Sequence, residues 1–129
     1  MLTWIKTYFR SPNIYILKYG EEIKTKEWPS YCDYYRDLFN KNKKIKIVFN
    51  ALELKKISGE QMWKKIRLMK SMRVVHQDYL ICFCLIINNP IIYKIINFSF
   101  KIAPPPIPYL ITNCTDIGLD YVDNFMVEQ

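Results

Sequence analysis

The run Tyr79–Ile87 constrains the fold most, because its nine residues are apolar throughout and show no alternation of apolar and polar positions. A strand with one face in solvent alternates, whereas a strand buried on both faces reads as a continuous apolar run. Asn88-Asn89-Pro90 ends the run with a turn signal. We therefore expect a buried central strand over residues 79–87.

The segments on either side of this run alternate between strand and helix patterns. Two β-branched and aromatic runs flank the turn signal Ser11-Pro12-Asn13 and predict an antiparallel hairpin. In chain order, the expected elements are strands over 3–9 and 14–19, a helix over 25–40, a strand over 45–50, a helix over 58–75, the central strand, a helix over 90–102, a strand over 109–112 and a helix over 116–126. Strands that alternate with helices imply a mostly parallel sheet. We predict a single α/β domain over residues 1–129, of the order ββαβαβαβα, with a mostly parallel five-stranded sheet, an antiparallel edge hairpin and helices packed on the sheet.

The helix over 58–75 has a clear start signal and a clear apolar stripe. Ser58 followed by Gln61 is the pattern of a capping box. The residues expected to face the core recur at helical spacing: Met62, Ile66, Met69, Met72 and Val75. His76 directly follows this helix, where a cation interacts favourably with the helix dipole, so we expect it to be exposed.

The apolar stretch that follows raises the question of a membrane. Tyr79–Tyr93 holds no charge, but its 15 residues are interrupted by a helix breaker, and a spanning helix needs about 20 apolar residues. The helix Pro90–Ile102 carries only Lys94 and Lys101 as charges. It is expected either to cover the sheet, with most of its apolar side chains in the core, or to lie in a membrane interface. The proline-rich stretch 103–108 is expected to be a stiff, extended connector.

The formal net charge of +7 is unevenly distributed, because residues 41–73 hold eleven Lys or Arg and two acids, a local charge of +9. Such a segment is suited to phosphates, anionic lipid headgroups or an acidic partner, or is a solvated basic face. The chain is rich in Ile, Lys, Tyr and Asn and holds two Ala. This bias is typical of an AT-rich genome, such as that of a giant virus or a protist, and it lowers the weight of each lysine.

Catalytic and cofactor signals are weak. Three glycines leave no room for a glycine-rich phosphate loop, and one histidine excludes a His-based zinc site. The chain has no CxxC pair, so its thiols are expected to be free in a reducing compartment: Cys32, Cys82, Cys84 and Cys114. In a strand, Cys82 and Cys84 would point to the same face as small buried side chains. We expect no enzymatic activity, no metal and no cofactor.

The order of elements, the strand Ile45–Asn50, the loop Ala51–Leu54 and the helix that opens at Ser58-Gly59 resemble STAS domains. This is the fold of bacterial anti-sigma-factor antagonists and of anion-transporter tails, and the likeness covers roughly residues 3–126. CRAL-TRIO lipid-transfer domains are more distantly similar through the apolar stretch 79–107. They are longer and enclose a lipid cavity, for which a chain of 129 residues is expected to be too small.

The resemblance implies a position for a regulatory site. STAS domains of the anti-sigma type carry an Asp-Ser-Ser/Thr-Gly motif before this helix, and a partner kinase phosphorylates its hydroxyl. The matching stretch here is Ile57-Ser58-Gly59-Glu60, which places Glu60 at or near the phosphorylated position. We therefore expect that the phosphorylation switch is absent.

Two functions follow from these observations. The first is a non-enzymatic regulatory or protein-interaction module that binds a partner, or a phosphorylated or nucleotide ligand, at the loop before the second long helix. The residues expected to form that surface are Lys55, Lys56, Ser58, Gly59, Glu60, Lys64 and Arg67. The alternative is a peripheral membrane or lipid-binding module that uses the basic region 41–73 and the apolar segment 90–108. We expect a cytoplasmic monomer or homodimer that does not bind nucleic acid.

Overall fold

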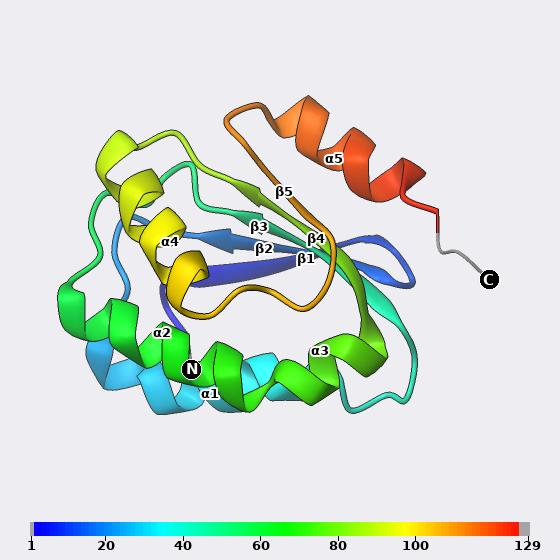
Figure 1. Ribbon diagram of the computed structural model, residues 1–129, viewed down its shortest axis with the longest axis horizontal. Helices are drawn as coiled ribbons and strands as arrows, with labels where there is room; N and C mark the ends of the chain where they lie inside the picture. Colours follow the sequence, from blue (N-terminus) through cyan, green and yellow to red (C-terminus); the bar gives the residue numbers. More distant parts are fainter. Residues whose placement is uncertain (1, 127–129) are drawn as a thin grey trace.

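The structure of the protein, a computed structural model, describes residues 2–126, and within them five strands form one sheet in the order β1-β2-β3-β4-β5 (Figure 1). In chain order the elements are β1 (Ile5–Ser11), β2 (Ile14–Tyr19), the 3-10 helix η1 (Thr25–Glu27), α1 (Trp28–Asp37), β3 (Ile45–Asn50), α2 (Gly59–Ser71), α3 (Arg73–Tyr79), β4 (Leu80–Ile86), α4 (Pro90–Ile102), β5 (Tyr109–Thr112) and α5 (Thr115–Asn124).

The sheet has the predicted topology. β1 runs antiparallel to β2, and the pairs β2–β3, β3–β4 and β4–β5 are parallel. The apolar run Tyr79–Ile87 contains β4, which pairs with a strand on each side and is buried along nearly its whole length. The expected α/β fold, with a mostly parallel sheet and an antiparallel edge hairpin, is confirmed.

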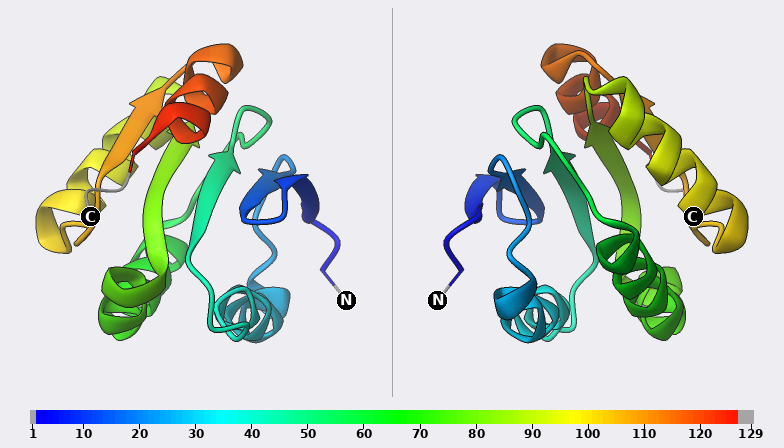
Figure 2. Two further views of the ribbon diagram at one scale, coloured as in Figure 1. Left: turned by 90° about the vertical axis from the view of Figure 1, so that its right-hand side faces the viewer. Right: turned by 90° about the vertical axis from the view of Figure 1, so that its left-hand side faces the viewer.

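The helices are divided unequally between the two faces of the sheet. Buried side chains of α1, α2 and α4 share one large core with the strands, whereas α5 packs on the other face. Figure 2 shows α5 on the opposite side of the sheet from α1, α2 and α3. Since successive strand residues point to opposite faces, Phe83 and Leu85 of β4 enter the large core, and Cys82 and Cys84 enter the small one.

Local side-chain contacts explain where two of the helices begin. Ser58 Oγ accepts a hydrogen bond from the Gln61 backbone N–H at 3.1 Å, and the Gln61 side chain accepts one from the Ser58 N–H at 3.0 Å. This is the predicted capping box. Asn89 Oδ1 accepts hydrogen bonds from the N–H groups of Ile91 and Ile92 at 2.9 and 3.3 Å, and Pro90 occupies the first turn of α4.

The helix expected over 58–75 is two helices. Met72 leaves helical geometry (φ −96°, ψ 2°), so that α2 ends before it and α3 begins after it. The side chain of Met72 is buried at this bend and fills the core between the two helices and the sheet.

The bend changes the environment of His76. We expected an exposed histidine at a helix end, and this was wrong, since only 4 % of its surface is accessible. The chain continues as α3 to Tyr79 instead of ending near Val75, and this turns the imidazole toward α1. There its ring centroid lies 5.7 Å from that of Tyr35 and 5.5 Å from that of Phe39.

α4 covers the sheet with one side only. Ile92 and Ile96 are buried as expected. Most apolar side chains of this helix were expected in the core, but Ile91 and Phe98 are 70 % and 50 % exposed. Seven residues span about two helical turns, so these two side chains lie on one outward stripe. None of the helices in the described part of the chain has the length and apolar character needed to cross a bilayer.

Candidate functional site

An apolar cavity of about 270 Å³ lies on the face of the sheet that carries the large core. Its lining includes the strand side chains Phe49, Phe83 and Leu85, together with Ile96 and Phe100 of α4. Small-molecule sites are concave, mostly apolar and about 300–1,000 Å³ in volume. The cavity therefore has the character of a small-ligand site, with a volume just below this range.

The connector after α4 forms another wall. Pro104, Pro105 and Pro106 line the cavity in succession, and their fixed φ angles and missing N–H groups keep this segment out of helix and sheet. Arg73 Nη1 donates a hydrogen bond to the Pro104 carbonyl oxygen at 3.2 Å. This exposed hydrogen bond joins the start of α3 to the proline connector, and both segments line the cavity.

Tyr35 and His76 supply a polar pair in the lining. Tyr35 Oη and His76 Nε2 share a hydrogen bond of 2.8 Å, and both residues are almost fully buried. Burial lowers the pKa of His76 to about 4, so the imidazole is neutral at neutral pH. Burial also raises the pKa of Tyr35 well above its usual value, which keeps the phenol protonated. The pair is an uncharged hydrogen bond in a mostly apolar lining.

Lys65 places a half-buried cation beside the same cavity. Its Nζ lies 5.5 Å from the ring centroid of Phe49 and 5.6 Å from that of Tyr19, which is the geometry of a cation–π contact. Burial lowers the pKa of the ammonium to about 8. Lys70 and Arg73 also line the cavity, and no Asp or Glu is found among the lining residues of the described chain.

The loop surface predicted from the sequence lies elsewhere, along the β3–α2 loop and the outer side of α2. Its lysines are engaged by acids. Lys55 Nζ lies 3.3 Å from a Glu21 carboxylate oxygen, and Lys56 Nζ lies 3.3 Å from one of Glu22. These exposed ion pairs are weak, but a phosphate would have to compete with them for the same ammonium groups.

The start of α2 is similarly occupied. Lys64 Nζ lies 3.4 Å from a Glu60 carboxylate oxygen, and Ser58 uses its hydroxyl and N–H in the capping box. Gly59 has open space around its α-carbon, and Arg67 is exposed on α2. The three predicted lysines are thus already paired with acids, and phosphate binding there stays a prediction.

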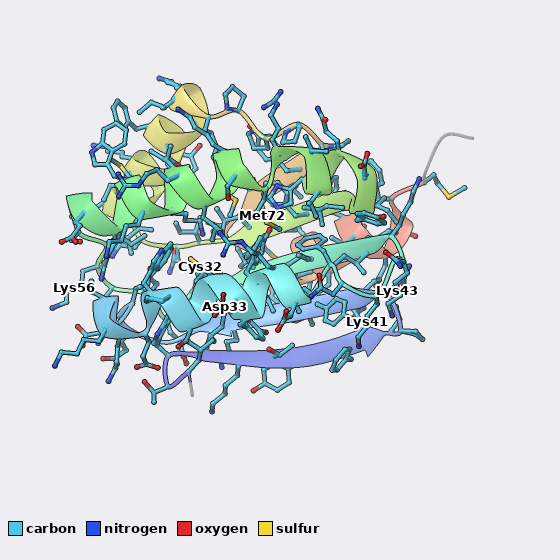
Figure 3. The ribbon with its side chains drawn as sticks, turned by 90° about the horizontal axis from the view of Figure 1, so that it is seen from below. Cys32, Asp33, Lys41, Lys43, Lys56 and Met72 are labelled. Carbon is cyan, nitrogen blue, oxygen red and sulfur yellow. The ribbon has the colours of Figure 1, made fainter. Side chains whose placement is uncertain are left out.

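The basic stretch 41–73 does not form one continuous patch. Figure 3 shows Lys41 and Lys43 at one end of the α1–α2 layer and Lys56 at the other end. Lys46 is buried in β3, on the α5 side of the sheet, where its Nζ donates to the Val122 and Phe125 carbonyl oxygens at 2.6 and 3.0 Å. The local charge of +9 is therefore dispersed over separate parts of the molecule.

The comparisons with known proteins concern the fold. No family model matches the chain, and no curated protein matches it. Among solved structures, it is similar to an uncharacterized protein of the DUF3478 family with a SpoIIAA-like fold from Shewanella loihica PV-4. The TM-score is 0.65 at 12 % identity, over 91 % of this chain and 90 % of that chain. The chain has a STAS-like fold. At this identity the similarity carries the architecture and no activity.

Sequence reasoning missed the cavity of this STAS-like domain and its cations. Lys65 follows Lys64 in a basic run, and the run alone does not show which of the two lysines faces the core. The helical phase does, because Lys65 lies three residues after Met62 and four before Met69, on the edge of the apolar stripe. That phase was the available signal. The contribution of Arg73 depends on the bend at Met72, for which the sequence offered no signal.

Proposed function

We propose that this STAS-like domain is a non-enzymatic regulatory module that binds a small apolar molecule in the cavity between α2, α3, α4 and the sheet. The observation that carries this proposal is the cavity itself, about 270 Å³ lined mainly by aliphatic and aromatic side chains. Protein interiors are otherwise close-packed, and apolar walls that lack partner atoms lose dispersion contacts. An apolar ligand restores those contacts and removes the walls from water.

A role without catalysis fits the polar groups around the cavity. Among residues 2–126, the cavity lining includes no carboxylate and no thiol, and the buried imidazole of His76 is neutral and bonded to Tyr35. General acid–base catalysis at neutral pH favours a group whose pKa lies near 7, and a histidine with a pKa of about 4 is poorly matched to it.

The same helix that lines the cavity also carries the predicted partner surface. Lys65 and Met69 of α2 face the cavity, whereas Lys64 and Arg67 belong to the outer surface. A ligand that shifts or rigidifies α2 would therefore alter the surface offered to a protein partner. This is the coupling that a regulatory module requires, with both sites biasing one element.

A cavity-filling variant tests ligand binding. Ser99 lines the cavity, and its Oγ donates to the Ile96 carbonyl oxygen at 2.7 Å. Ser71 is exposed on α2 and makes the matching bond to the Leu68 carbonyl oxygen, also at 2.7 Å. We expect the neutral apolar dye Nile red to bind the folded wild type and Ser71→Phe, and to bind Ser99→Phe at least tenfold more weakly. Equal dye binding by the two variants, both with native near-UV circular dichroism, would reject the proposal.

A peripheral membrane role is the second candidate, and α4 is the feature that favours it. Ile91 and Phe98 form an exposed apolar stripe with Lys94 and Lys101 beside it, and α4 holds no acidic residue. Such a face suits an anionic bilayer surface. In flotation with phosphatidylserine vesicles at physiological salt, Phe98→Ser should lose binding, whereas Lys41→Glu, away from α4, should retain it. A wild type that does not float would remove this candidate.

A further inference from the structure

The ammonium of Lys65 has different contacts from those of Lys46 and Lys64. Lys46, which is more deeply buried, donates to two backbone carbonyl oxygens. The neighbouring Lys64 pairs with Glu60. Within residues 2–126, no carboxylate lies within 4.0 Å of Lys65 Nζ. A cation partly removed from water without an anionic partner is unfavourable, and the faces of two aromatic rings compensate for this only in part.

The residues around Lys65 add further positive charge to the cavity. Lys70 and Arg73 line the cavity with it, and the part of the lining that the structure describes includes no acid to balance the three cations. Low-dielectric walls focus such a field, which attracts anions and excludes cations. Tyr35 and His76, which also line the cavity, are neutral at neutral pH.

We infer that the ligand of this cavity is an amphiphile with an apolar body and one anionic head, and that Lys65 binds the head. The inference rests on the proposed function, since it identifies the class of molecule that the cavity accepts. The apolar body lies against Phe83, Leu85 and Ile96, while the head meets the ammonium at the edge of the stripe. A free fatty acid and any other small apolar carboxylic acid would both supply such an apolar body and a carboxylate head.

If Lys65 binds the anionic head, the protein takes up a proton when the ligand binds. The pKa of Lys65 is lowered to about 8 by burial in the free protein, so a large fraction of the amine is neutral at mildly alkaline pH. A bound carboxylate stabilises the ammonium and raises its pKa. Binding of an acid at about pH 8.5 therefore takes up a proton. The other titratable or charged groups that face Lys65 or the cavity are Tyr19, Tyr35, Lys70, Arg73 and His76. Burial keeps the imidazole of His76 neutral at this pH and raises the pKa values of both tyrosines.

Octanoate and octanol separate this inference from the proposed function, because they share the apolar chain and differ in the head. We expect wild type to bind octanoate about 10-fold to 100-fold more tightly than octanol at neutral pH, the range of a charge-assisted hydrogen bond. Calorimetry at about pH 8.5, in two buffers of different ionisation enthalpy, should show proton uptake with octanoate and none with octanol.

Two variants complete the test. Lys65→Met removes the charge and keeps the chain length, and it should equalise the two affinities and abolish proton uptake. Lys65→Gln checks the result with a polar side chain. Lys64→Met, next along the helix and paired with Glu60 in wild type, should keep the preference for octanoate. Equal binding of both probes by wild type, or a preference that survives Lys65→Met, overturns the inference and leaves the proposed function standing. Binding of neither probe overturns both.

Discussion

Gly118 lies directly against Cys84, because a β-carbon at Gly118 would stand 2.7 Å from the Cys84 Sγ and 3.1 Å from Cγ1 of Ile86. The glycine is buried in α5, and the two side chains it meets belong to β4. The close approach lets α5 reach the sheet. The small core beneath it, which includes Val48 and Val122, depends on that approach.

Gly118→Ala is expected to push α5 away from β4. Inserting a methyl group into a packed core costs typically about 1–3 kcal/mol, and this outweighs the gain in helix propensity of about 1 kcal/mol. Urea denaturation should show the lower free energy of unfolding. Gly59→Ala is the matched control, since nothing lies within 4 Å of a β-carbon there, and it should be neutral or slightly stabilising. Equal effects at the two glycines would contradict the close contact.

Lys46→Met should also loosen α5, through its C-terminal end. The ammonium of Lys46 donates to the carbonyl oxygens of Val122, in the last turn of α5, and of Phe125, its C-cap residue. Removing the ammonium takes one hydrogen bond from each of these largely buried acceptors, at a cost of about 1–3 kcal/mol. The measurement is the free energy of unfolding together with amide exchange at the end of α5.

Lys44→Met is the comparison for that experiment, because Lys44 is exposed just before β3. Surface substitutions of this kind usually change stability by less than about 0.5 kcal/mol. If Lys44→Met lowered the free energy of unfolding as much as Lys46→Met, the effect would come from net charge and not from the two hydrogen bonds.

The fold was predictable because its signals are local and agree with one another. The apolar run around Phe83 defines the central strand, and prolines and asparagines mark the ends of elements. The capping box of Ser58 and Gln61 positions α2 without reference to the rest of the chain. Consistency among such signals is what allows a sequence of this kind to specify one architecture.

The site was less predictable because it depends on contacts between distant segments. The Tyr35–His76 hydrogen bond joins residues 41 positions apart, and the Arg73–Pro104 bond joins residues 31 apart. Neither pair has a motif. The cavity itself is a volume left between helices, and its size depends on the bend at Met72 and the path of the prolines. Local sequence patterns predict neither the bend nor this path. Those patterns therefore favoured the exposed loop before α2 as the site.

Ser58→Ala tests the capping box that opens α2. The variant loses the bond to the Gln61 N–H and weakens the reciprocal arrangement, which should cost about 1 kcal/mol. Ser30→Ala is a suitable control, because Ser30 is exposed near the start of α1 and does not cap that helix. Thermal denaturation of both variants measures the difference. Equal melting temperatures for the two would show that the cap contributes little in this context.

His76 should make the stability of the domain fall in mildly acidic solution. Its pKa in the folded chain is about 4, against an ordinary value of 6.5. As the pH falls below about 6.5, the unfolded chain takes up a proton that the folded chain refuses, so unfolding becomes easier. The loss is complete once the pH has fallen through the folded pKa, and it amounts to roughly 3 kcal/mol.

Urea denaturation of wild type and His76→Gln, at several pH values between about 7 and 4, isolates this contribution. Glutamine keeps a polar group within reach of the Tyr35 hydroxyl but does not titrate, so the variant should lose less stability over this range. Two carboxylates provide the contrast. Hydrogen bonds from Thr3 and Arg10 lower the pKa values of Glu27 and Asp123, respectively, so their stabilisation is lost only at lower pH. Parallel pH profiles for wild type and His76→Gln would assign the acid sensitivity to groups other than the buried imidazole.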